Sequence, residues 1–116
     1  MQRAVIIAIA LSVVSAGAAA AADKMRFWNL TAAEISELYL APAGTTQWSP
    51  NQCLNDSDKS VEADERLDLK DIAPGRYDVK LADKTGRHCL VKDVAVKSGG
   101  KYAFSISEKE LTDCTK

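Results

Sequence analysis

The sequence predicts an all-β fold, a small antiparallel β-sandwich of about six or seven strands. Apolar Tyr77, Val79 and Leu81 alternate with charged residues, which is the period of a strand with one buried face. A similar alternation returns in residues 101–107. Turn-forming residues separate the apolar runs about every ten residues, as expected for antiparallel strands, and they lie at 73–75, 83–86 and 98–100.

The N-terminal segment predicts export. Residues 1–22 begin with Gln2 and Arg3, continue with an apolar run of about a dozen residues and end in alanines, as a secretory signal peptide does. We expect cleavage near Ala22, a single β-sandwich domain over residues 23–116, and a periplasmic or secreted location. The apolar run is too short to span a bilayer and no cysteine follows it to carry a lipid, so no membrane anchor is expected.

The charge of the chain argues against nucleic acid as a partner. The chain has 15 Lys and Arg against 16 Asp and Glu, and loss of Arg3 with the leader leaves 14 basic residues and a net charge of about −2. Because no basic stripe is present, electrostatic attraction to nucleic acid is not expected.

Residues 32–40 are compatible with either a strand or a short helix. A capping-box pattern at residues 31–34, followed by apolar residues at helical spacing, favours the helix. Pro42 leaves little room for it, however, and the aromatic and aliphatic residues fit a strand if Ser36 and Glu37 form a bulge. A short helix at the C-terminus is also left open.

The second half predicts one irregular strand among regular ones. In residues 87–97 the buried positions change parity, which a bulge at Lys92 and Asp93 explains. Cys89 then faces the core opposite Leu81, where an inert thiol and a disulfide are equally compatible with the pattern. The other expected core-facing residues are Leu67 and Leu69 in an earlier strand and Tyr102, Phe104 and Ile106 in the last one.

Three cysteines follow the leader, so one disulfide is expected in an oxidising compartment and one thiol is left over. The disulfide candidates are Cys53, Cys89 and Cys114. Three pairings exist and the sequence does not choose between them. The pattern slightly favours Cys53–Cys114, since both lie in loop or tail positions while Cys89 lies within a strand.

The stretch NLTAAEISELYLAPAGTTQWSPN resembles a group of small secreted bacterial proteins that share Leu-Tyr-(Val or Leu)-x-Pro-x-Gly, a few residues and then Trp. The matching residues are Asn29, Thr31, Ile35, Leu38, Tyr39, Pro42, Gly44, Trp48 and Asn51. The chain departs from the group at Ala41, where Ser is usual, and at Ser49, where Gly is usual. The resemblance implies a β-sandwich-like envelope protein without assigned biochemistry, and it favours a strand over residues 33–40.

The second half, from LDLKDIAPGRYDVKL to KYAFSI, is also similar to the transthyretin-like and carboxypeptidase-regulatory β-sandwich modules of secreted proteins. Both resemblances imply one architecture, and neither implies a reaction.

No pattern in the chain predicts catalysis or a cofactor. The single histidine, His88, adjoins Cys89, but neighbours on a strand point to opposite faces and do not form a nucleophile–base pair. The scattered cysteines lack zinc-ligand spacing, and no Cys-x-x-Cys-His motif for haem is present. We therefore expect a protein that is not an enzyme and has no cofactor.

The acidic run NDSDKSVEADE offers a weak calcium site at most. Its candidate ligands are Asp56, Asp58, Glu62 and Asp64. The run fails the EF-hand pattern because Val61 replaces the turn glycine and Leu67 the bidentate glutamate. A solvated loop is the simpler interpretation.

Three aromatic residues, Trp28, Tyr39 and Trp48, are the candidate ligand-binding residues, because aromatic rings supply contact area at little entropic cost. The competing interpretation is structural, in which Trp48 seals one end of the core after the chain turns at Pro42 to Gly44.

The function expected from these observations is a non-enzymatic binding module of the cell envelope. It would engage a partner protein through an exposed sheet edge or the loops around Trp48. The alternative is a small-ligand or calcium carrier that uses the acidic loop at residues 55–65 and the aromatic residues.

Overall fold

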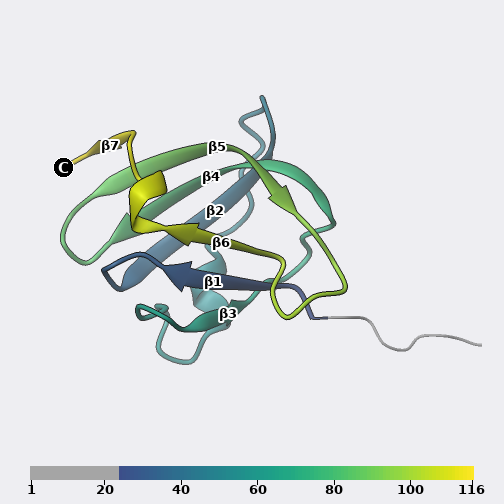
Figure 1. The fold of residues 1–116 in the computed structure, drawn as a ribbon, viewed down its shortest axis with the longest axis horizontal. Coiled ribbons are helices and arrows are strands. Elements are labelled where there is room, and N and C mark those ends of the chain that lie inside the picture. Colours follow the sequence, from purple (N-terminus) through teal and green to yellow (C-terminus); the bar gives the residue numbers. More distant parts are fainter. Residues whose placement is uncertain (1–23) are drawn as a thin grey trace, which may run out of the picture.

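The computed structural model describes residues 24–116 and confirms an all-β sandwich of seven strands (Figure 1). One sheet holds β3 (Arg66–Asp68), β1 (Arg26–Leu30) and β6 (Phe104–Ser107), and the other holds β2 (Ile35–Pro42), β4 (Gly75–Asp83), β5 (His88–Val96) and β7 (Cys114–Thr115). Two 3-10 turns complete the fold, η1 (Gln52–Asn55) and η2 (Glu108–Glu110). The predicted signal peptide, residues 1–22, lies outside the described residues.

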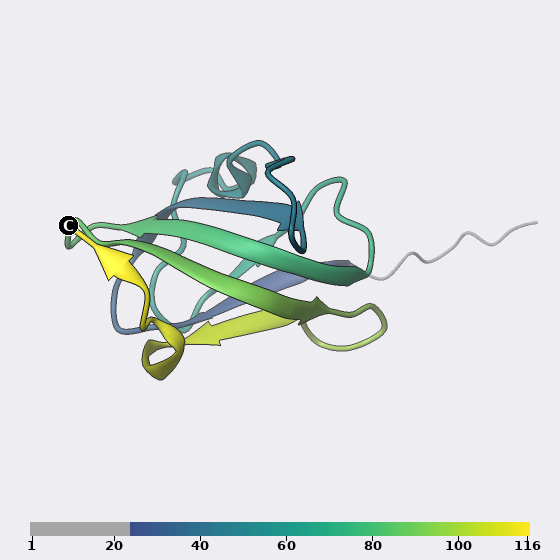
Figure 2. The same ribbon diagram turned by 90° about the horizontal axis from the view of Figure 1, so that it is seen from above.

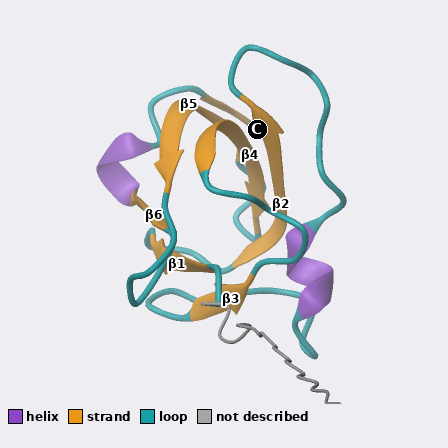
Figure 3. Cartoon of the chain, turned by 90° about the vertical axis from the view of Figure 1, so that its right-hand side faces the viewer, coloured by secondary structure: helices purple, strands orange, loops and turns teal. Residues whose placement is uncertain are grey.

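The two sheets face each other across one hydrophobic core (Figure 3). Its residues come from both sheets, from η1 and from the connecting loops, and they include Phe27, Leu38, Val79, Leu81, Cys53, Val61, Phe104 and Ile106. Within residues 24–116, no helix has the length and apolar character needed to cross a membrane.

One strand pair differs from the predicted antiparallel arrangement. β1 and β6 run parallel, with Phe27 opposite Phe104 and Leu30 opposite Ser107 (Figure 1). A parallel pair needs a long connection. Here that connection contains three strands of the second sheet, β2, β4 and β5, and also β3, before the chain returns beside β1 as β6.

Residues 35–42 form strand β2, so the helix considered for residues 32–40 is wrong. The register shifts between Ile35 and Glu37, which confirms the bulge that a strand requires there. Thr31 does not cap a helix, since its hydroxyl donates to the Oδ1 of the buried Asn29 at 2.7 Å. The C-terminal helix is reduced to the single 3-10 turn η2.

β4 is one of the two inner strands of its sheet and pairs with β2 and β5 on its two sides (Figure 2). The register with β5 shifts at Lys92 and Asp93, which confirms the predicted second bulge. The carboxylate of Asp78 accepts a 3.0 Å hydrogen bond from the Asp93 N–H and another from the Gly44 N–H. One side chain, only 8% exposed, thus ties the bulge of β5 to the turn after β2.

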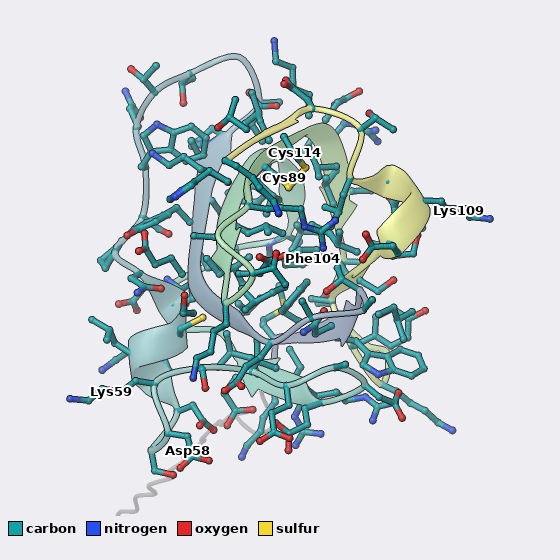
Figure 4. The ribbon with its side chains drawn as sticks, turned by 90° about the vertical axis from the view of Figure 1, so that its left-hand side faces the viewer. Asp58, Lys59, Cys89, Phe104, Lys109 and Cys114 are labelled. Atoms are coloured by element: carbon teal, nitrogen blue, oxygen red, sulfur yellow. A yellow bond between two sulfur atoms is a disulfide. The ribbon has the colours of Figure 1, made fainter. Side chains whose placement is uncertain are left out.

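The disulfide joins Cys89 and Cys114, so the favoured Cys53–Cys114 pairing is wrong (Figure 4). Cys89 faces the core and pairs with Leu81, as predicted, and Cys114 lies directly opposite it on β7 with a Cα–Cα distance of 4.1 Å. The sequence hid this pair because a two-residue strand such as β7 has no readable alternation.

Cys53 is the unpaired cysteine and lies in the core. It is held in η1 against β2, where its Sγ lies 3.5 Å from the Ile35 carbonyl oxygen. Desolvation by burial raises the pKa of Cys53 to about 12, and the negative charges of Asp56 and Glu37 add to the effect. The thiol therefore stays protonated at neutral pH.

The last regular strand is shorter than the alternation predicts. Phe104 and Ile106 are buried as expected, but Tyr102 precedes β6 and is 38% exposed, so its predicted core position is wrong. Its ring packs instead against Trp28, with centroids 5.1 Å apart. Leu67 in β3 is buried, and Leu69, which follows the strand, is partly buried against the core.

The disulfide should contribute a large share of the free energy of unfolding. Its sequence separation is 25, so the double variant Cys89→Ser/Cys114→Ser should lose about 3.5 kcal/mol on the chain-entropy model, measured by urea unfolding. Thiol titration of the oxidised protein should find no reactive thiol when folded and one when denatured. The Cys53→Ser variant should show none in either state. Two or more thiols in denatured oxidised protein would contradict the pairing.

Acid should weaken the link that Asp78 makes. Hydrogen bonds from the Gly44 and Asp93 N–H groups lower the pKa of Asp78. A lowered folded-state pKa gives stability that is present above the unfolded value, about 3.9, and is lost as pH falls through the folded value. Asp78→Asn should therefore be less stable than wild type at pH 7, measured by urea midpoints, and the difference should narrow below about pH 4.

The matched control is Asp58→Asn, which changes an exposed carboxylate in the acidic loop. It should leave the urea midpoint unchanged at both pH values. A deficit of Asp78→Asn that stays constant with pH would contradict the assigned role of the carboxylate.

Candidate functional site

The outer face of the four-stranded sheet carries two rows of side chains that point away from the core. The strand registers place Tyr39 beside Lys80 and Lys80 beside Leu90. The neighbouring row consists of Glu37 on β2, Ala82 on β4 and His88 on β5. Because side chains alternate between the two faces of a sheet, these rows lie opposite the core residues of the same strands.

A loop folds Trp48 back over this face. After β2 the chain turns at Gly44, whose φ of 81° suits glycine, and then returns along the edge of β2. The Ser49 N–H donates to the Leu40 carbonyl oxygen at 2.8 Å, and the Leu40 N–H donates to the Ser49 hydroxyl at 3.1 Å. These two bonds hold the segment that carries Trp48 beside the strand.

Lys80 joins the two aromatic residues. Its Nζ lies 4.4 Å from the centroid of the Trp48 ring and 5.1 Å from that of Tyr39. A cation over an aromatic face is attracted to it, which stabilises both rings in place. The Tyr39 hydroxyl donates to Glu37 Oε1 at 3.0 Å, and burial, followed by this carboxylate, raises the pKa of Tyr39, so the phenol stays protonated.

These residues enclose an open hollow of about 460 Å³, which we call the aromatic hollow. Trp48 and Tyr39 supply its aromatic lining, and Lys80, Glu37 and His88 supply polar groups. The remaining lining residues come from β4, β5 and the C-terminal segment, and they are Leu81, Ala82, Cys89, Leu90, Asp113 and Thr115. Apolar walls with a few convergent polar groups are typical of ligand-binding sites.

The structure brings together two of the three predicted aromatic residues. Trp28 lies on the other sheet. The Arg66 guanidinium lies 4.2 Å from the centroid of the Trp28 ring, and the Trp28 Nε1–H donates to Asp64 Oδ1 at 3.1 Å. Trp28 is therefore not part of the aromatic hollow.

The interpretation of Trp48 as a seal on the core is wrong. Trp48 is half-buried and does not belong to the core cluster, and it packs on the outer face of the sheet over Lys80. Sequence reasoning also missed Lys80, Glu37 and His88. The only signal for them is their shared parity on strands whose pairing register was unknown.

The acidic loop does not build a calcium site. Asp58 and Lys59 lie at the outer end of the loop and point away from the domain (Figure 4). Asp64 is engaged with Trp28, and Asp56 accepts a hydrogen bond from the Asp58 N–H at 2.8 Å. Over residues 24–116 no three His, Cys, Asp or Glu side chains, Glu62 included, gather in a way that could hold a metal ion.

The cysteines offer no activated nucleophile. Cys89 is consumed by the disulfide, and Cys53 is buried with a pKa of about 12. His88 is exposed on the outer face, while the Cys89 side chain faces the core, as strand alternation predicts.

Comparison with known proteins adds no relative to this description. No model of a known protein family, no curated protein and no solved structure matches the chain. The resemblances to small secreted bacterial proteins and to transthyretin-like modules stay predictions.

The outer-face position of Trp48 can be tested by its effect on stability. Because Trp48 lies outside the core, Trp48→Ala should cost about 1 kcal/mol or less of unfolding free energy. Leu38→Ala, at a fully buried position of the adjacent strand, should cost about 2–5 kcal/mol. Urea unfolding of both variants measures the difference, and a Trp48→Ala cost equal to that of Leu38→Ala would place the ring in the core.

Proposed function

We propose that this protein is an exported, non-enzymatic binding module of the cell envelope that engages a partner protein through the aromatic hollow. The observation that carries the proposal is the pair of rings, Trp48 and Tyr39, held over an open hollow by Lys80. Trp and Tyr are enriched among the residues that dominate binding energy at protein interfaces. Their preorganised rings lose little conformational freedom on binding.

The proposed export is supported from two sides. Residues 1–22 have the order of a secretory leader. The Cys89–Cys114 disulfide fits an oxidising compartment, where such bonds persist. The resemblance of residues 29–51 to small secreted bacterial proteins agrees with this placement.

The proposed lack of enzymatic activity is supported by the state of the nucleophile candidates. Cys53 is a protonated core thiol and Cys89 is oxidised, so neither supplies a thiolate to His88. The polar groups of the hollow can orient a bound group by hydrogen bonds.

A second candidate function is the binding of a small organic ligand in the same hollow. Its favouring observation is size, since about 460 Å³ falls within the range of about 300–1,000 Å³ that small-molecule sites occupy. The metal-carrier version is not proposed, because the acidic side chains are not gathered.

Site-specific crosslinking tests the proposal. A photoreactive benzoylphenylalanine in place of Trp48 should yield one discrete protein adduct in envelope fractions of the producing cell. The same group in place of Trp28 is the matched control, since it lies on the other sheet, and it should yield no adduct. Excess wild-type domain should compete for the adduct, whereas excess Trp48→Ala should not.

The two candidates give different results in this experiment. A small molecule that copurifies with wild type but not with Trp48→Ala, without any protein adduct, would favour the carrier. Equal adducts from positions 48 and 28 would refute the hollow as the interaction site.

A further inference from the structure

The two sheets leave an open seam between β5 and β6. β5 pairs with β4 on one side, and β7 covers only His88 and Cys89 on the other. β6 pairs with β1 alone. The two strands lie side by side at the margin where the sheets meet (Figures 2 and 3). We use the name open seam for the space between residues 91–96 and 104–107.

The seam is closed at its ends and open in the middle. At one end the Lys97 N–H donates to the Ala103 carbonyl oxygen at 3.0 Å, and beyond the other end the Leu90 N–H donates to Asp113 at 2.9 Å. Between these bonds lies a hollow of about 660 Å³, lined by both strands and by the loop that connects them. Val94 and Phe104 are among its apolar lining residues.

Two of the other sheet edges, those of β2 and β3, are covered by the chain itself. The free edge of β2 bonds with Ser49, Asn51 and Val61. The free edge of β3 is met by η1, where the Asn55 side chain donates to the Asp68 carbonyl oxygen at 2.9 Å. An edge strand directs alternate N–H and C=O groups to its open side, so the part of β5 that β7 leaves uncovered presents backbone groups ready to pair with an added strand.

The rim of the seam is positively charged. Lys92, Lys97 and Lys101 line it, all exposed, and none of them forms an ion pair within residues 24–116. Its two carboxylates are already engaged, Asp93 with Arg76 at 2.6 Å and Glu110 with the Ser107 N–H at 2.8 Å. Edge lysines repel a second copy of the same edge and attract an acidic segment.

We propose that the open seam is a docking site for an extended acidic segment of a partner protein, which adds as a strand to the uncovered edge of β5. Main-chain hydrogen bonds to β5 would hold the segment, and its acidic side chains would face the three lysines. Its alternate apolar side chains would cover Val91 and Val94, which are only partly buried. The seam is separate from the aromatic hollow, so this inference does not rest on the function proposed above.

The test is the binding of short synthetic peptides, measured by fluorescence anisotropy at low and physiological ionic strength. The probe alternates valine and glutamate. Two comparison peptides replace glutamate by lysine or interrupt the acidic sequence with proline, which removes backbone donors without changing its charge. We expect the uninterrupted acidic peptide to bind, and both comparison peptides to bind at least about tenfold more weakly, a difference of about 1.4 kcal/mol.

The protein variants locate the site. Lys92→Glu/Lys97→Glu/Lys101→Glu should weaken binding of the acidic peptide at least about tenfold. The matched control, Lys59→Glu/Lys70→Glu/Lys116→Glu, makes the same change of charge at exposed positions outside the seam and should bind like wild type. Circular dichroism checks that both variants fold. Amide hydrogen exchange should show new protection in residues 91–96 when the peptide is bound.

Several results would overturn the proposal. Equal binding of the proline-interrupted peptide would mean charge attraction without strand addition. Equal loss in both triple variants would mean a dependence on net charge alone. A dimer of the free protein that protects the same amides would make a second copy of the chain the occupant of the seam. If the acidic peptide does not bind, the seam is not a docking site for an acidic strand.

Discussion

The structure depends on the register of β4 against its two neighbours. A shift of one residue would move every side chain of a strand to the opposite face of the sheet. The core and the outer rows of side chains therefore depend on the same register. Two bulges, at Ser36 on β2 and at Lys92 and Asp93 on β5, restore the parity that an uninterrupted pairing would lose. The Asp78 carboxylate holds one of these bulges by bonding the Asp93 N–H, and it bonds the Gly44 N–H as well. A single buried acceptor therefore links the register of the sheet to the turn from which the Trp48 loop begins.

The same register explains how a short chain builds the aromatic hollow without weakening its core. On β4, Val79 and Leu81 are buried while Lys80 between them is exposed, and Lys80 is the residue that meets both Tyr39 and Trp48. The aromatic hollow thus rests on strands that the core already fixes. Loops alone would hold such rings less rigidly, because their backbone has fewer partners.

Alternation and turn chemistry predicted most of the architecture from the sequence. They identified the strand around Val79, the bulge at Lys92 and Asp93, and the position of Cys89 opposite Leu81. For residues 32–40 they left a helix and a bulged strand open, and only the resemblance to small secreted proteins favoured the strand. They could not predict β7 or the parallel pairing of β1 with β6, since a two-residue strand has no period and parallel neighbours are distant in sequence. The disulfide pairing was mispredicted for the same reason, because Cys114 lies on β7. Trp48 was misplaced for a related reason, because a large aromatic residue after a turn fits a core end and an outer face equally well until the return path of its loop is known.

β5 is shared by the two proposed sites, and the way each site uses it keeps them distinct. The aromatic hollow takes side chains from the start of the strand, His88 and Leu90, whereas the open seam offers backbone groups and apolar side chains from residues 91–96. The bulge at Lys92 and Asp93 lies next to the boundary, and its bond to Asp78 fixes it to β4. A strand added at the seam would lengthen the hydrogen-bonded ladder without touching Trp48. A ligand in the hollow would cover Trp48 and leave the edge unpaired. The two proposals therefore assign partners of different chemistry to one small sandwich, one recognised through aromatic rings and the other through main-chain pairing and charge.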